Sequence, residues 1–186
     1  MFIFWWLLAK IISIPFVTNA LIKRAKRTPY THILSPDGNV VYMERYWLFN
    51  PYFTHEEKEA FAAAGQPVPW KYPVSIRIHC ICTPDDDRAQ HDHPWDARTI
   101  VMRGSYLEQR GSAYRLIEAG QTGRLRFGKD FHRIRQVFPE PKDNGVWTLF
   151  ITHKYQGTWG YDVNGTKIPF KEYLRATGDA NYKGPK

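Results

Sequence analysis

Short runs of β-branched and aromatic residues, each followed by a turn residue, fill most of the chain from residue 40 onward. Two of these runs, 40–49 and 74–83, alternate in side-chain character, which is typical of half-buried strands. Shorter runs follow at residues 99–103, 105–109, 113–117, 124–127, 131–137, 146–153 and 158–163. Many short strands separated by glycine-rich turns predict an all-β sandwich or closed barrel.

One short helix interrupts the predicted strands. Residues 54–64 begin with a threonine cap, carry glutamates in the first turn and stop at Gly65. With 186 residues, the chain has the size of one domain with an extension. We therefore divide it into an N-terminal hydrophobic and basic helix at 1–27, a barrel at 28–176 and a polar C-terminal tail at 177–186.

The first 22 residues are almost entirely apolar, with Lys10 as the single charge, and four basic residues follow within 23–27. This length matches a membrane span, and the basic flank would keep the barrel on the cytoplasmic side. Lys10, Pro15, Thr18 and Asn19 count against a span, because each is costly in lipid. Three hypotheses stay open: a helix that covers the domain's own core or a second subunit, an interfacial helix anchored by tryptophans, and a true span. We expect a cytoplasmic protein, with peripheral contact to the inner face of a membrane as an open option.

Charge and cysteine content narrow the classes of partner. Lys and Arg number 26 against 18 Asp and Glu, a net charge of +8, which favours anionic partners. The two cysteines, Cys80 and Cys82, point the same way along one predicted strand and suit a disulfide poorly. We interpret them as small core residues of a reducing compartment rather than as metal ligands.

Histidines spaced for metal binding lie in the middle of the chain. His91 and His93 follow the acidic loop at 85–87, and on a strand two residues at this spacing project to one face. His132 lies in a later strand, and a barrel lets it converge on the other two from across the interior. The sequence therefore predicts a three-histidine metal site, with surface or structural histidines as the alternative. Three other histidines without a companion at ligand spacing are expected on the surface or in packing: His32, His55 and His153.

The segment HDHPW at 91–95, the strand after it and Gly104 together resemble the first motif of the cupin superfamily. Residues 120–132, a glycine turn before a strand that ends in His132, resemble the second cupin motif. The resemblance covers most of residues 31–175 and is to small phage and bacterial cupin-like proteins of unassigned function. It implies a cupin-type double-stranded β-helix, or jelly-roll barrel, with a metal held by His91, His93 and His132.

One position departs from the cupin pattern. Ala97 stands where the family has a metal-binding glutamate, so the resemblance implies a three-histidine site similar to that of the thiol dioxygenase branch. Such a site keeps open positions for water, substrate or dioxygen, as catalytic metals do. Imidazoles with few carboxylates suit Fe(II), Zn, Ni or Cu better than Mg or Ca. The resemblance favours Fe(II), with Zn, Ni or Mn as alternatives.

Five further residues are candidates for the chemistry around the metal. Glu108 and Tyr106 share one face of a predicted strand and are candidate catalytic residues for proton transfer. Arg98 lies beside the missing glutamate and is a third candidate, by orienting an anionic substrate. Arg77 and His79 share the polar face of the run at 74–83 and are candidate substrate-binding residues. An exposed strand face is the alternative for Glu108 and for the pair at 77 and 79.

Two hypotheses for the function follow. The first is a metal-dependent small-molecule enzyme of oxygenase type that acts on a small anionic substrate at the three-histidine site. The second is a noncatalytic cupin, a binding or structural protein with a viral origin among the options, that docks through its N-terminal helix to a membrane or partner. Nucleic acid is a minor hypothesis for the partner, and a homodimer stays open.

Overall fold

The structure is a computed structural model that describes residues 2–53, 55–69, 72–85 and 88–181. Thr54, the expected cap of the short helix, lies outside these residues. In chain order the elements are α1 (Phe2–Ile12), α2 (Pro15–Ala25), β1 (Pro29–Leu34), β2 (Val41–Phe49), α3 (His55–Ala63), β3 (Ser75–Ile81), β4 (Trp95–Arg103), β5 (Ser105–Arg110), β6 (Ala113–Glu118), β7 (Thr122–Leu125), β8 (Arg133–Phe138), β9 (Val146–Tyr155), β10 (Gly160–Val163), β11 (Thr166–Pro169) and α4 (Phe170–Thr177).

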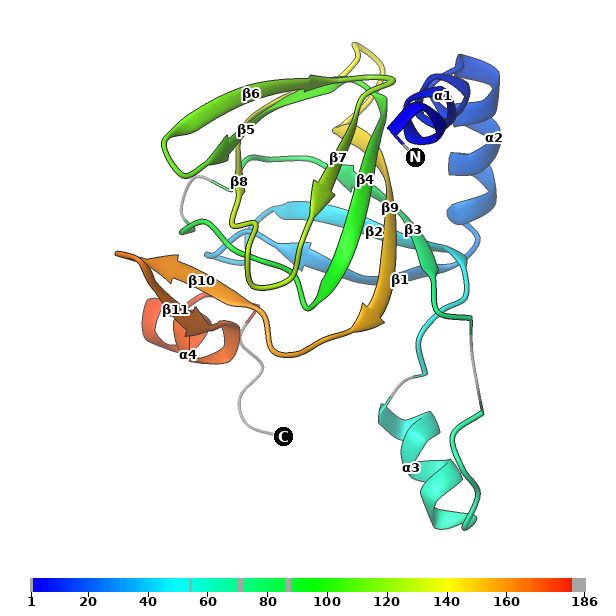
Figure 1. Cartoon of the computed structure of the whole chain (residues 1–186), viewed down its shortest axis with the longest axis vertical. Helices are drawn as coiled ribbons and strands as arrows, with labels where there is room; N and C mark the ends of the chain where they lie inside the picture. Colours follow the sequence, from blue (N-terminus) through cyan, green and yellow to red (C-terminus); the bar gives the residue numbers. More distant parts are fainter. Residues whose placement is uncertain (1, 54, 70–71, 86–87, 182–186) are drawn as a thin grey trace.

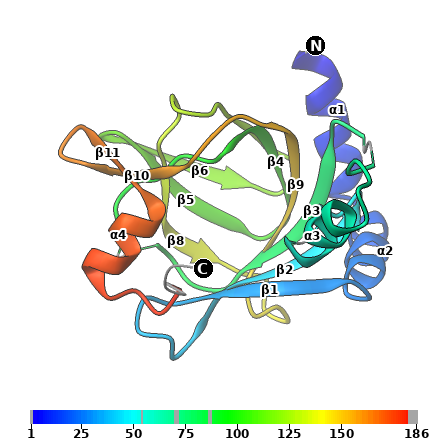
Figure 2. The ribbon, with the colours of Figure 1, turned by 90° about the horizontal axis from the view of Figure 1, so that it is seen from below.

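Antiparallel pairing joins the described strands into three sheets (Figure 1). The largest has the order β1-β2-β3-β9-β4-β7, the second is β6-β5-β8, and the third is the hairpin β10-β11. The late strand β9 lies between β3 and β4 and pairs with both. Figure 2 shows the sheets curving around one interior, although the hydrogen bonds of the described strands do not form a single closed ring. The expected all-β architecture is confirmed.

Most of the predicted strands are present with boundaries shifted by a few residues, and α3 is the predicted short helix. Three elements were not predicted: β1, β11 and α4. The first residues of the segment that was expected to be a polar tail, 177–186, are instead attached to the fold. Asp179 is buried, and the Asn181 side chain donates a hydrogen bond to the Leu34 carbonyl (2.8 Å). Buried polar groups of this kind fix a segment to the fold. Residues 182–186 lie outside the described part of the chain.

The N-terminal segment is two helices rather than the single helix expected at 1–27. Pro15 begins α2, where its missing N–H is not needed. The Thr18 hydroxyl donates to the Ile12 carbonyl at 2.7 Å and so satisfies the end of α1. The chain turns by 80° between the helices. No single helix in the described chain is long and apolar enough to cross a bilayer, whereas α1 and α2 meet that test only as a bent pair.

Both N-terminal helices pack on the outer face of the largest sheet. Ala9 and Ile12 of α1 join Ile22 and Ala25 of α2 in one buried cluster. The sheet contributes the other side of this cluster: Tyr46, Ile78, Cys80, Ile100, Met102, Trp147, Leu149 and Ile151. Cys80 is therefore a small core residue, as expected, and both cysteines are free. Both helices therefore cover the domain's own core, which was one of the three hypotheses for the N-terminal segment.

The inner face of the same sheet points toward the barrel interior. Strand register places Trp47 of β2 opposite Arg77 of β3, Arg77 opposite Phe150 of β9, and Phe150 opposite Thr99 of β4. Because side chains alternate along a strand, these four residues share one face in a row across the sheet. The face opposite the helices is thus rich in polar and aromatic groups, and it forms the wall of a cavity.

Candidate metal centre and its cavity

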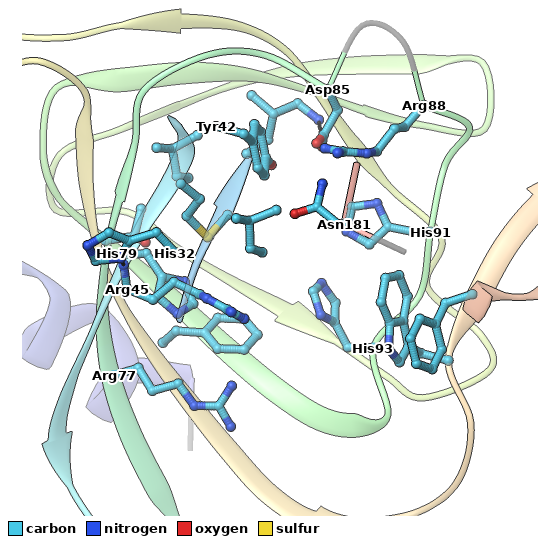
Figure 3. A pocket seen from close by; sticks show the side chains of 18 of the residues that line it. His32, Tyr42, Arg45, Arg77, His79, Asp85, Arg88, His91, His93 and Asn181 are labelled. Atoms are coloured by element: carbon cyan, nitrogen blue, oxygen red, sulfur yellow. Dashed lines mark hydrogen bonds between the residues drawn. The ribbon is translucent and has the colours of Figure 1, made fainter. Parts of the chain in front are cut away.

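A cavity of about 500 Å³ occupies the barrel interior. Aromatic and aliphatic side chains form much of its lining, and Phe170 and Leu174 of α4 contribute part of the wall. In Figure 3, His91 and His93 lie on one side of the cavity, and Arg77 and His79 lie on the other. A mostly apolar cavity with a few convergent polar groups is the usual form of a small-molecule site.

The three predicted histidines come together at the cavity wall. One ring nitrogen from each of His91, His93 and His132 lies within 4.8 Å of the others. His93 Nε2 and His132 Nε2 are 2.9 Å apart. Two backbone hydrogen bonds fix the approach, from His91 N to the His132 carbonyl (2.8 Å) and from His132 N to the His91 carbonyl (3.0 Å). His91 and His93 lie just before β4, with only an isolated bridge at His91, and not on a strand as expected.

Asp92, between the two histidines, holds their segment in place. Its buried carboxylate accepts hydrogen bonds from Gly128 N (2.9 Å), Gly160 N (2.7 Å) and Lys167 Nζ (2.6 Å). These bonds tie the histidine segment to the loop before β8 and to the hairpin β10-β11. The middle residue of the motif is therefore structural, and it leaves the imidazoles on either side for the cavity.

Glu108 of β5 lies behind His132. Its carboxylate accepts a hydrogen bond from His132 Nδ1 (2.9 Å) and pairs with Arg110 through Nε (2.9 Å). Burial raises the pKa of Glu108, but the hydrogen bond with His132 and the pairing with Arg110 lower it to about 2. The ionised carboxylate keeps a hydrogen on His132 Nδ1 and orients Nε2 toward the neighbouring histidines.

The residues present fit a divalent transition metal. Burial is the main cause that lowers the pKa of His91 to about 4 and that of His93 well below its usual range, so both imidazoles are neutral at pH 7. His91 Nδ1 is buried without a hydrogen-bond partner among the described residues. Three imidazoles this close form a ligand set for such metals. Ala97 is buried against Leu125 and Phe150, so no carboxylate from that position joins the set.

Comparisons with known proteins were made on sequence and on structure. No protein-family model matches the chain, and no curated protein matches it. A cupin 2 conserved barrel domain protein from Rhodopseudomonas palustris is 10% identical with a TM-score of 0.44, over 74% of this chain and 77% of that one. A cupin-like protein from Thermotoga maritima is 14% identical with a TM-score of 0.40, over 72% of this chain and 84% of that one. The structural neighbours include cupins.

One further neighbour has a described activity. A chain from the crystal structures of the DMSP lyases RdDddP and RnDddQII is 12% identical with a TM-score of 0.42. The alignment covers 65% of this chain and spans only 53% of that one. The all-β fold stands as predicted, although the hydrogen bonds of the described strands do not close the barrel.

The other predicted site residues divide between the cavity and the outside of the barrel. Arg77, His79 and Tyr106 all line the cavity. Glu108 is buried behind His132 and is not on an exposed strand face. Arg98 does not join them: its guanidinium lies 4.6 Å from the centre of the Trp5 ring, on the helix-covered side of β4. The reason is register, because Thr99 takes the inward position and side chains alternate along the strand.

The sequence patterns did not identify several residues that line the cavity. His32, expected on the surface or in packing, lines the cavity and accepts a hydrogen bond at Nδ1 from Arg45 N (3.1 Å). Asp85 lines it too, and its carboxylate accepts from Ile134 N (2.9 Å). The acidic run at 85–87 was the only sequence signal for Asp85. His153 is exposed as expected, and the side chain of His55 lies outside the described residues.

Proposed function

We propose that this protein is a metal-dependent small-molecule enzyme of oxygenase type that acts on a small organic anion. The observation that carries the proposal is the convergence of three histidines on one side of a cavity that holds the buried guanidinium of Arg77 on another. Fe(II) is the favoured metal, because the three-histidine motif resembles that of thiol dioxygenases.

His91, His93 and His132 would hold the metal. Three protein ligands leave coordination positions free, and the bound metal would supply a place where dioxygen and substrate meet. Dioxygen is the oxidant in this proposal. Both of its atoms enter the product, so the reaction needs no separate reductant. Glu108 keeps a hydrogen on His132 Nδ1 and so serves as a positioning residue behind the metal.

Arg77 and His79 are suited to bind the anionic group of the substrate. Arg77 is 5% exposed and its Nε has no hydrogen-bond partner in the described structure. Trp47, Tyr52 and Trp95 surround its guanidinium, each with the ring centre 4.5 to 4.8 Å away. These rings shield the guanidinium from solvent, and an ion pair with a carboxylate is stronger there than in water.

The distance between the two ends of the cavity limits the substrate. The Phe150 ring lies between them, with its centre 5.2 Å from the His79 ring and 5.3 Å from the His93 ring. The His79 and His93 rings are therefore separated by about the width of one aromatic ring, a gap that a small organic anion can span. Burial raises the pKa of Tyr106, so its hydroxyl stays protonated at neutral pH and is available as a hydrogen-bond donor.

Metal analysis tests the proposal first. We expect about one transition-metal ion per chain in the purified protein, and loss of that ion in the double variant His91→Ala, His93→Ala. The exposed His153→Ala variant is the matched control and should keep the metal. Metal-free native protein, or a double variant that binds metal as the native chain does, would contradict the metal site and favour the noncatalytic alternative.

Nitric oxide tests whether the metal has a free position. Adding this dioxygen surrogate to protein loaded with Fe(II) should produce the electron paramagnetic resonance signal of an iron–nitrosyl centre. Dioxygen uptake in the presence of small organic acids then tests turnover, and Arg77→Met should reduce it mainly by raising KM. If the metal binds but no nitrosyl signal appears, the metal has no free coordination position, and this result would contradict the oxygenase assignment.

A further inference from the structure

We propose that the outer face of α1 and α2 docks on an anionic lipid bilayer, with the two helices lying in the plane of its interface. This inference is independent of the metal site. It rests on the side chains that the helices leave exposed, on the charges beside them and on the bend between the helices.

The exposed side of the helix pair is apolar. Ile3, Leu7 and Ile11 follow one another at helical spacing on α1, and Ile14 lies in the break before α2; each is about half exposed or more. Phe16, at the start of α2, is the most exposed of the large apolar side chains in the described chain, at 82%. Single exposed apolar residues are common, whereas a continuous stripe of large ones marks an interaction surface.

The exposed apolar side chains of this segment are not needed to bury the core of the barrel. On α1 the buried positions are Ala9 and Ile12, and on α2 they are Thr18, Ile22 and Ala25. The large exposed residues lie on other sides of the same helices. A helix that only covered a core would carry polar side chains there, so the outer side chains indicate a second apolar environment.

The charges indicate that this environment is anionic lipid. Residues 1–36 contain five basic residues and neither Asp nor Glu. The five side chains are exposed: Lys10, Lys23, Arg24, Lys26 and Arg27. Basic residues beside an exposed apolar stripe match the headgroups and acyl boundary of an acidic bilayer. A second copy of the same surface fits less well, since it would bring like charges together.

The bend favours a helix pair that lies on the surface. A turn of 80° after α1 divides the apolar segment into two short helices, and both already use one side to bind the barrel. Figure 1 shows the pair together against one edge of the molecule, where a flat surface can reach them. Trp6 is half exposed on α1, and tryptophan is enriched at membrane interfaces.

Vesicle flotation with the full-length protein tests the inference. We expect binding to phosphatidylcholine vesicles that contain phosphatidylserine, little binding to pure phosphatidylcholine, and loss of binding in high salt. The double variant Ile3→Ser, Phe16→Ser should reduce binding about tenfold, because affinity follows the buried apolar area. Lys23→Glu, Arg24→Glu should remove the preference for phosphatidylserine. The control is Tyr114→Ser, an exposed aromatic on β6.

The remaining outcomes overturn the inference. Equal binding to neutral and acidic vesicles, or variants that bind as the native chain does, would exclude an anionic bilayer as the partner. A native dimer that the Ile3, Phe16 variant dissociates in the absence of lipid would instead assign the stripe to a second copy of the chain. Circular dichroism and metal content of each variant show whether its fold is retained.

Discussion

At the scale of single residues, Glu108 connects the metal centre to the rest of the barrel. Its buried carboxylate binds His132 on one side and Arg110 on the other. A buried carboxylate is stable as an anion only with such partners. The same anion orients the imidazole and increases its strength as a ligand. The position of one glutamate on β5 therefore influences how strongly the three histidines, which lie outside β5, would bind a metal.

We expect Glu108→Gln to weaken metal binding by about 10- to 100-fold, the usual effect of removing a hydrogen-bonding partner behind a metal ligand. The amide keeps the size of the side chain but loses the charge that favours His132 with its hydrogen on Nδ1. Competition with a chromophoric chelator measures the affinity. Glu118→Gln, on the exposed face of the adjacent strand β6, is the control. An unchanged Kd for Glu108→Gln would show that the tautomer is fixed by another group.

Sequence patterns identified the three-histidine group because the spacing of its members is local. His91 and His93 are two positions apart, and the glycine turn before His132 is a local signal as well. Arg98 was assigned wrongly, since only strand register decides whether it or Thr99 faces inward. Asp85 and His32 were missed for a related reason: they reach the cavity through contacts between segments far apart in the chain.

At the scale of elements, the N-terminal helices combine two functions on different faces. Ile12 is 7% exposed and packs in the core cluster, whereas its neighbour Ile11 is 53% exposed. Adjacent residues of one type thus allow the two faces to be tested separately. The core face stabilises the barrel, and we propose that the outer face binds lipid.

Ile12→Ala should lower the free energy of unfolding by about 2 to 4 kcal/mol, because it removes buried methyl groups and leaves a cavity against the sheet. Ile11→Ala should change it by less than about 0.5 kcal/mol, as surface substitutions usually do. Urea denaturation followed by circular dichroism measures both. Equal effects of the two substitutions would mean that α1 does not pack as described.

Helices and strands were predicted correctly where alternating side-chain character or a glycine turn marked them. They were missed where contacts between distant segments of the chain determine the structure. Gly104 has a φ of 79° and links β4 to β5, a conformation that favours glycine, so this boundary was visible in the sequence. The helix α4 was missed because one buried residue, Leu174, anchors it. The break between α1 and α2 was missed because the apolar composition of the segment obscured Pro15 as a start signal.

At the scale of the whole molecule, an ion pair joins the C-terminal segment to the loop after β3. Arg88 Nε and Asp179 Oδ2 are 2.8 Å apart, and both side chains are buried. Burial raises the pKa of Asp179, but hydrogen bonds from Arg88 and Asn181 outweigh it and lower the pKa below its usual 3.8. A lowered pKa in the folded state contributes stability above the unfolded value, which is lost as the pH falls through the folded value.

Asp179→Asn should therefore destabilise the protein by about 3 kcal/mol at pH 7, where it leaves Arg88 buried without its anion. The difference from the native chain should shrink as the pH falls below about 4 and through the lowered pKa of Asp179, because protonation then removes the negative charge that the variant lacks. Urea midpoints measured between pH 3 and 7 check this, with the exposed Glu140→Gln as control. A difference that stays constant with pH would contradict the assigned ion pair.

The position of β9 in the largest sheet also determines when the barrel can assemble during synthesis. Ser75 of β3 pairs with Thr152 of β9, 77 residues later in the chain. On the ribosome, β3 and β4 must wait for the strand that lies between them, and pairing over such separations is slow. Meanwhile α1 and α2 leave the ribosomal exit tunnel before the strands of the sheet that later buries their inner face. A nascent chain therefore carries exposed apolar helices for most of its translation, and chaperone or lipid contact in that interval would protect it from aggregation.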